Sequence, residues 1–130
     1  MEENTYECAC IESETGIRYY SCNNTNFFVK GDTIYALDLD KMTFVELFKE
    51  DFDEVVFSSN ATPKWIEIIA IKENVPVFIA TYSKQQHAIV HRNALKVIGK
   101  SFDKNIFICK PADSEEPIYG ISNGTLIFSV

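Results

Sequence analysis

The 130-residue sequence has little glycine and proline, five and four residues respectively, and no apolar run that could cross a membrane. A membrane span needs roughly 18 to 20 consecutive apolar residues, so we expect no membrane partner. The glycines stand apart from one another, which excludes the glycine-rich loops that cradle phosphate groups. No segment has the composition of a linker or a repeat. These absences predict a single compact domain over residues 1–130.

A signature of export is missing as well, and the signals of catalysis are weak. The first five residues, Met-Glu-Glu-Asn-Thr, carry negative charge, whereas a secretory signal begins with positive charge and an apolar run. For nucleophilic catalysis the sequence offers serine and cysteine residues but only two histidines, His87 and His91, to activate them. We therefore expect a cytoplasmic protein without a cofactor, and the sequence favours a binding role over an enzymatic one. In the cytoplasm we expect reduced thiols at the four cysteines, Cys8, Cys10, Cys22 and Cys109.

Aromatic side chains are abundant, with ten Phe, six Tyr and one Trp, or 13% of the chain. Aromatic and β-branched residues fit the pleated surface of a sheet. Turn signals separate the apolar runs: Asn23-Asn24 precedes a hairpin over 27–39, and Asn123-Gly124 is typical of a two-residue hairpin turn. The sequence therefore predicts a mainly β fold, with α+β as the alternative. We expect an antiparallel sheet, or a small barrel or sandwich, of about eight to ten short strands.

Two segments fit either a helix or strands. Residues 40–57 repeat apolar side chains at helical spacing, but their aromatic and β-branched content favours two strands. Residues 63–72 are dominated by isoleucine and also favour a strand over a short helix. We expect strands in both segments.

One helix is predicted near 83–98. Ser83 and Gln86 match a capping box, in which each side chain satisfies a free backbone amide at the start of a helix. Gly99 can end the helix in the left-handed conformation. Between them, Val90, Ala94, Val97 and Ile98 form an apolar stripe at helical spacing.

Candidate metal ligands form only weak patterns. On the predicted helix His87 and His91 would share a face, as paired zinc ligands do, but a zinc protease needs glutamate directly after the first histidine and Ala88 stands there. Cysteines 8 and 10 lie only two positions apart, closer than the pairs that usually bind zinc. A pairing of Cys109 with a histidine in space stays open. We expect no metal site and assign no catalytic residue.

The net charge of −7 is unevenly distributed along the chain. Residues 1–60 contain thirteen acidic and four basic residues, a balance of −9, whereas residues 61–130 contain six acidic and eight basic residues, a balance of +2. An acidic protein repels a phosphate backbone, which argues against a nucleic-acid partner. The acidic half instead favours an encounter with a basic protein surface.

The sequence therefore predicts an acidic protein-binding module, most simply an inhibitor or immunity-type protein that covers a basic partner such as a nuclease toxin. The alternatives are a small enzyme or ligand-binding β-barrel, with an aromatic-lined pocket near a histidine, and a subunit of a larger assembly. The oligomeric state is left open. The acidic residues around two predicted loops, together with one aromatic side chain, are the candidate partner-binding residues: Asp38, Asp40, Glu50, Asp51, Phe52, Asp53 and Glu54.

Overall fold

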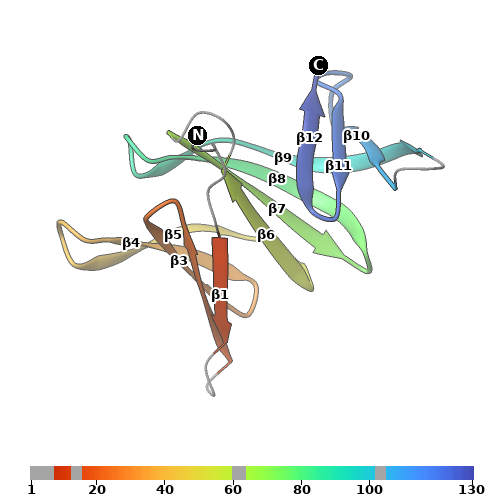
Figure 1. Ribbon diagram of the computed structural model, residues 1–130. Coiled ribbons are helices and arrows are strands. Elements are labelled where there is room, and N and C mark those ends of the chain that lie inside the picture. Colours follow the sequence, from red (N-terminus) through yellow and green to blue (C-terminus); the bar gives the residue numbers. More distant parts are fainter. Residues whose placement is uncertain (1–7, 13–15, 60–63, 102–104) are drawn as a thin grey trace, which may run out of the picture.

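The computed structural model describes residues 16–59, 64–101 and 105–130, together with the backbone of residues 8–12. Within these ranges the regular structure consists of strands and contains no helix that could span a membrane. The strands form two antiparallel meanders, a five-stranded sheet in the order β1 to β5 and a seven-stranded sheet in the order β6 to β12 (Figure 1). Their bounds are β1 Cys8–Glu12, β2 Ile17–Cys22, β3 Thr25–Lys30, β4 Thr33–Asp38, β5 Thr43–Lys49, β6 Glu54–Ser59, β7 Trp65–Lys72, β8 Val75–Ser83, β9 Ala88–Lys100, β10 Phe107–Pro111, β11 Tyr119–Ser122 and β12 Thr125–Ser129.

Short turns with positive φ set the register of the meanders. Consecutive residues with positive φ fit type I′ turns, whose twist matches that of the flanking strands. Asn and Gly adopt this conformation at the lowest cost. Three hairpins are joined in this way, at Asn23-Asn24, Glu73-Asn74 and Asn123-Gly124.

The first core lies between the two sheets. Phe27 of β3 stacks on Phe57 of β6 with ring centroids 4.5 Å apart, and its ring meets Tyr82 of β8 edge-on at 5.2 Å. Phe48 of β5 contacts Phe78 of β8 at 5.0 Å. One face of the five-stranded sheet is therefore buried against β6, β7 and β8.

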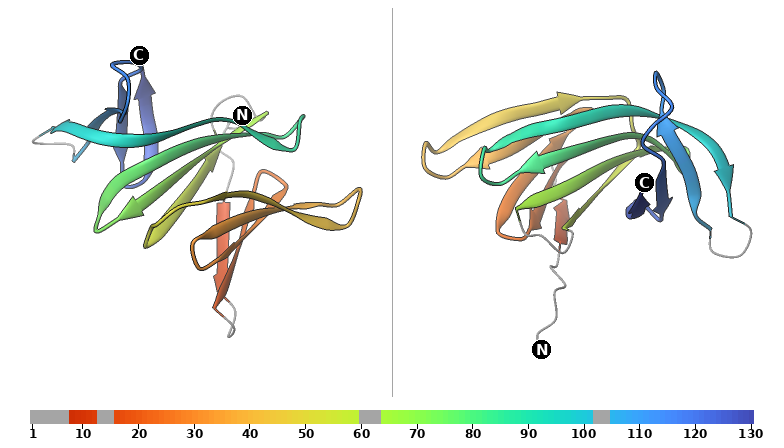
Figure 2. Two further views of the ribbon diagram at one scale, coloured as in Figure 1. Left: turned by 180° about the vertical axis from the view of Figure 1, so that it is seen from behind. Right: turned by 90° about the horizontal axis from the view of Figure 1, so that it is seen from above.

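A second core lies on the opposite face of the seven-stranded sheet. That sheet curls so that β12 returns towards β6 and β7 (Figure 2). Register shifts in the β7–β8, β8–β9, β9–β10 and β11–β12 ladders accompany the curl, as β-bulges do in strongly bent sheets. The curl encloses a buried cluster of side chains from four strands: Ile69, Ile71, Ile79, Cys109, Tyr119 and Ile121.

The sequence of β7 reflects its position between these two cores. Ile66 and Ile68 point into the first core, whereas Ile69 and Ile71 belong to the second. A strand buried on both faces has a nearly continuous apolar sequence instead of an alternating one. Residues 63–72 resembled a helix for this reason, and the prediction of a strand is confirmed from Trp65 onward; residue 63 lies outside the described residues.

The prediction of a helix near 83–98 is wrong. The first turn of the capping box does form, because the backbone amide of Gln86 donates to Ser83 Oγ at 3.1 Å and that of His87 donates to the Ser83 carbonyl at 2.8 Å. The turn then stops at His87, whose φ is +55°. From Ala88 the chain runs as β9 between β8 and β10, where its β-branched residues fit a sheet better than a helix.

Other sequence predictions are confirmed. The hairpin over 27–39 corresponds to β3 and β4, and residues 40–57 form strands, β5 and β6. The described part of the chain contains twelve strands, more than the eight to ten expected, in part because the predicted helix is a strand. The fold is antiparallel and β throughout its described regular structure, as the aromatic and β-branched composition indicates.

Candidate functional site

The predicted acidic residues lie in two separate places. Asp38 ends β4 and Asp40 follows in the β4–β5 turn, whereas residues 50–54 lie at the far end of β5, where the chain crosses to β6. The length of the β4–β5 hairpin therefore separates the two groups. The structure does not bring the seven predicted residues together as one patch.

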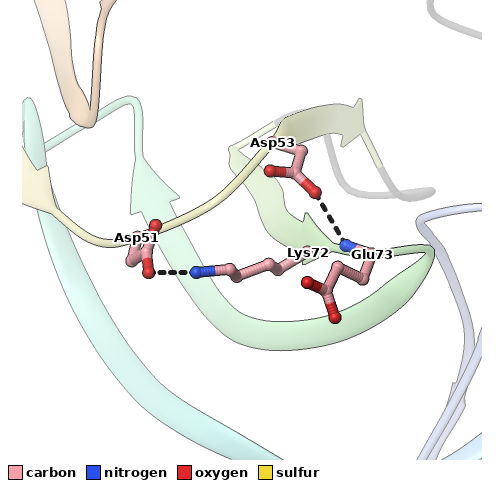
Figure 3. A network of polar contacts seen from close by, with 4 residues as sticks. All are labelled: Asp51, Asp53, Lys72 and Glu73. Carbon is pink, nitrogen blue, oxygen red and sulfur yellow. Dashed lines mark hydrogen bonds and ion pairs between the residues drawn. The ribbon is translucent and has the colours of Figure 1, made fainter.

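The crossing at residues 50–54 has structural contacts of its own (Figure 3). Asp51 forms an ion pair with Lys72, and Asp53 Oδ2 accepts a hydrogen bond from the Glu73 backbone amide at 2.7 Å. The hydrogen bond to Asp51 raises the pKa of Lys72. Phe52 is half-buried against the first core. These contacts attach the crossing to the β7–β8 turn, and the Glu50 backbone amide donates to the Asp32 carbonyl at 3.0 Å.

The β4–β5 turn is ordered but open to solvent. Asp38 Oδ1 accepts hydrogen bonds from the backbone amides of Asp40, at 3.0 Å, and Lys41, at 3.3 Å. This arrangement is an Asx turn, which restricts the backbone without burying side chains. Leu39 is 58% exposed and Met42 is 73% exposed. The turn therefore combines carboxylates with exposed apolar side chains.

The outer face of the five-stranded sheet carries aromatic side chains. Tyr19, Phe28 and Tyr35 are neighbours across β2, β3 and β4. Phe28 contacts Tyr19 and meets Phe44 edge-on, both with ring centroids 5.1 Å apart. The Tyr19 hydroxyl donates to Asn26 Oδ1. A shallow hollow of about 280 Å³ lies over this surface and is lined by Ile17, Phe28, Lys30, Tyr35 and Phe44. We call the apolar part of this surface the aromatic face and define it as Ile17, Tyr19, Phe28, Tyr35 and Phe44.

The aromatic face departs from the usual pattern of a one-sided sheet. An antiparallel sheet with one buried face normally presents polar side chains to water. Here Phe44 is 60% exposed, and the other members of the aromatic face are half-buried. Contiguous exposed apolar surface of this kind marks interaction sites in soluble proteins.

Adjacent aromatic residues in the sequence indicate this face. Tyr19-Tyr20 and Phe27-Phe28 are adjacent aromatic pairs in strands, so one member of each pair must point away from the core. Tyr20 and Phe27 are buried in the first core, whereas Tyr19 and Phe28 face outward. Adjacent aromatic residues in a strand therefore predicted an aromatic outer face.

The histidines do not share a face. His87 lies in the β8–β9 turn and His91 in β9, so the zinc-like spacing has no helix to support it. No group of three metal-ligating side chains occurs within the described ranges. His87 instead lines a pocket of about 220 Å³ between the two sheets, beside Tyr82, Lys84 and Asp40. Burial and the charge of Asp38 raise the pKa of Tyr82.

A polar cluster lies on the inner face of the seven-stranded sheet. Thr81 Oγ1 donates to Glu67 Oε1 at 2.9 Å, and burial raises the pKa of Glu67, against the lowering effects of Thr81 and His91. Asn93 Nδ2 donates to the Tyr119 hydroxyl at 3.4 Å. No buried side-chain nitrogen or oxygen of the described residues lacks a hydrogen-bond partner. The cluster is thus satisfied by the protein itself.

The cysteines differ from expectation. Cys22 is disulfide-bonded, so the prediction of four reduced thiols is wrong. Pairing of β1 with β2 places its Cα opposite that of Cys8, a proximity between distant positions that spacing alone did not reveal. Cys109 is a free thiol in the second core, and burial raises its pKa to about 11. Such a thiol is a poor nucleophile, because the reactive form is the thiolate.

Comparisons with protein-family models, with curated proteins and with solved structures found no match for this chain. Leu39, Met42 and Phe44 are exposed large apolar side chains that lie in the β4–β5 hairpin, next to the half-buried rings of the aromatic face.

Proposed function

We propose that the protein is a protein-binding module of the inhibitor or immunity type, and that the aromatic face together with the β4–β5 turn is its binding surface. The observation that carries the proposal is the exposure of Phe44 beside Phe28 on a sheet face that should be polar. Aromatic side chains dominate the energetics of protein interfaces, because they bury a large area with few rotatable bonds.

The charge of this half of the molecule favours a basic partner, such as a nuclease-type toxin. Residues 1–60 have a balance of −9, and Asp38 and Asp40 lie in the turn next to Phe44. Over residues 16–49 four acidic residues balance four basic ones, so the excess negative charge of this half comes from residues 1–15 and 50–54, while Asp38 and Asp40 are carboxylates beside the aromatic face. Opposite charges at the edge of an aromatic surface would accelerate the encounter, while the aromatic contacts would hold the complex.

The proposal is tested by comparing two serine variants as immobilised baits in a lysate of the native cell. Phe44→Ser removes the most exposed ring of the aromatic face, and Ile127→Ser removes a side chain of β12 that is 53% exposed. We expect wild type and Ile127→Ser to retain the same basic protein at a stoichiometric level, and Phe44→Ser to lose it. Equal retention by Phe44→Ser, or the absence of any stoichiometric basic partner, would refute the proposal.

A second function, binding of a small ligand, is favoured by the pocket beside His87. Its walls combine apolar side chains with a phenol, an ammonium group and an imidazole, a mixture that is typical of ligand sites. Lys84 Nζ already donates to the Asn23 carbonyl at 2.7 Å, which leaves His87 as the side chain to test. Screening a metabolite library by thermal shift against wild type and His87→Ala would support this function if a ligand stabilised the wild type alone.

A further inference from the structure

β5 is an edge strand whose first half is exposed on both faces and along its outer edge. It pairs with β4 on one edge, and no described strand pairs with its other edge. Residues 43–46 are all exposed, whereas Phe48 is buried in the first core. A strand in which four consecutive residues are exposed has both faces and the outer edge accessible. The hairpin of β4 and β5 also projects from the body of the molecule (Figure 1).

Natural sheets usually protect such an edge. Proline, inward-pointing lysine, a bulge or a covering segment prevents another strand from pairing with it. Residues 43–46, Thr-Phe-Val-Glu, contain neither proline nor lysine. The register shift in this hairpin lies between Ile34 and Tyr35, opposite the buried half of β5. The edges of the second sheet differ, because β6 and β12 contact each other.

We propose that the binding partner adds an extended strand to β5 along residues 43–46, an inference that rests on the proposed function. Backbone hydrogen bonds to the open edge would supply affinity, and side chains of the added strand would supply specificity. Phe44 and Glu46 lie on the side of the aromatic face, since their Cα partners are Leu37 and Tyr35. Alternate side chains of the added strand would therefore lie beside Phe44 and Glu46.

This position specifies the chemistry of the added strand. A side chain next to Phe44 meets an aromatic surface and should be apolar or aromatic. A side chain next to Glu46, or near Asp38 and Asp40, meets carboxylates and should be lysine or arginine. The partner segment is accordingly an extended peptide with apolar and basic residues on one face.

A second copy of the chain fits this edge less well than a basic partner. Antiparallel pairing of residues 43–46 with the same residues of a second copy would place Glu46 opposite Thr43, so no basic side chain would lie opposite Glu46. A basic strand supplies the opposite charge that Glu46 lacks in such a pair. Charge therefore favours a basic strand over self-association.

The experiment uses the full chain and a synthetic ten-residue peptide whose odd positions, on one face of the extended peptide, alternate phenylalanine with lysine, and whose even positions are threonine. Two further versions carry N-methyl groups on alternate residues, one set on each edge of the extended peptide. We expect the unmethylated peptide to protect the amides of residues 43–46 from hydrogen–deuterium exchange. We expect one methylated version to bind about tenfold more weakly or worse, because it cannot donate to β5, and the other to bind unchanged.

A variant of the edge strand separates strand addition from side-chain docking. Val45 lies on the core side of β5, opposite Ala36, and is 37% exposed. Val45→Glu adds an attractive charge for a basic peptide, but an added strand would bury that charge. Weaker peptide binding to Val45→Glu supports strand addition. Gln85→Glu, at an exposed position of the β8–β9 turn outside the paired segment, adds the same charge and is the control for charge alone.

The outcomes distinguish the two proposals. Binding that requires Phe44 but is insensitive to both methylated peptides and to Val45→Glu would overturn strand addition and leave the aromatic face as the binding surface. Binding that is unaffected by Phe44→Ser would overturn the proposed function. Failure of the peptide to bind at all, or a concentration-dependent dimer that Val45→Glu dissociates, would also overturn addition of a partner strand.

Discussion

The two sheets of this protein are alike in having apolar side chains on both faces, and they differ in how the second face is covered. The seven-stranded sheet curls and encloses its own inner face, where Ile69 and Ile121 are fully buried. No segment within the described residues covers the outer face of the five-stranded sheet in this way, and Phe44 is 60% exposed there. An apolar strand sequence alone therefore does not distinguish a second core from a binding surface.

The largest expected effect is a difference in stability between removing a buried ring of β3 and removing an exposed ring of β5. Phe27 is fully buried and contacts Phe57 and Tyr82, so Phe27→Ala should lower the free energy of unfolding by about 3–5 kcal/mol. Phe44→Ala removes an exposed ring that contacts Phe28, and this change should lower the free energy of unfolding by about 0.5–1.5 kcal/mol. Urea denaturation of both variants measures the difference. Similar losses would mean that Phe44 belongs to the core and that the outer face is structural.

A smaller effect is expected where the curled sheet closes on itself. Gly124 has a φ of +79°, and a Cβ at this position would lie 2.4 Å from Val56 Cγ2. Gly124→Ala should therefore destabilise the protein by about 1–3 kcal/mol. Gly31→Ala is the control, because Gly31 has a φ of +64° but open space around it. If thermal denaturation shows equal losses, backbone conformation and not closure of the sheet explains the Gly124 effect.

The inner face of the curled sheet also predicts a pH dependence. Burial is the main cause that raises the pKa of Glu67, so the folded state binds this proton more tightly than the unfolded state. The carboxylate therefore destabilises the fold increasingly as pH rises from its unfolded pKa through its folded pKa. Glu67→Gln keeps an acceptor for Thr81 and should be more stable than wild type at neutral pH. This advantage should vanish in acid, and denaturation curves across pH that differ by a constant would contradict the assignment.

The smallest expected effect is the reactivity of Cys109. Its thiol is buried and its pKa is about 11, so at neutral pH it should not react with Ellman's reagent in the folded protein. Denaturant should expose it. Rapid reaction of Cys109 in the native state would show that the second core opens readily.

Much of the fold could be predicted from particular residues. Asn123-Gly124 and the aromatic composition indicated hairpins and a β fold, because both act through local backbone preference. The segment after Ser83 misled, because its capping box does form one turn and only tertiary pairing with β8 and β10 makes the remainder a strand. Local signals describe the turn but not the sheet that follows.

The candidate site was harder to predict. Asp38 and Asp40 were singled out from charge alone, and they remain predicted contacts beside the aromatic face. Asp51 and Asp53 were singled out in the same way, but their carboxylates contact Lys72 and the Glu73 amide, some twenty residues away in sequence. The aromatic face depends on the alignment of three strands, and only the adjacent pairs Tyr19-Tyr20 and Phe27-Phe28 indicated it locally.

The most direct test of the aromatic face as the binding surface is oxidative footprinting of the protein alone and bound to the basic partner that the wild-type bait retains. We predict that Tyr19, Tyr35, Met42 and Phe44 lose reactivity on binding, because the partner covers them. Trp65 and Phe128, which are 38% and 39% exposed on other strands, should keep theirs. Unchanged labelling of the first group, or protection of the second group alone, would contradict the account.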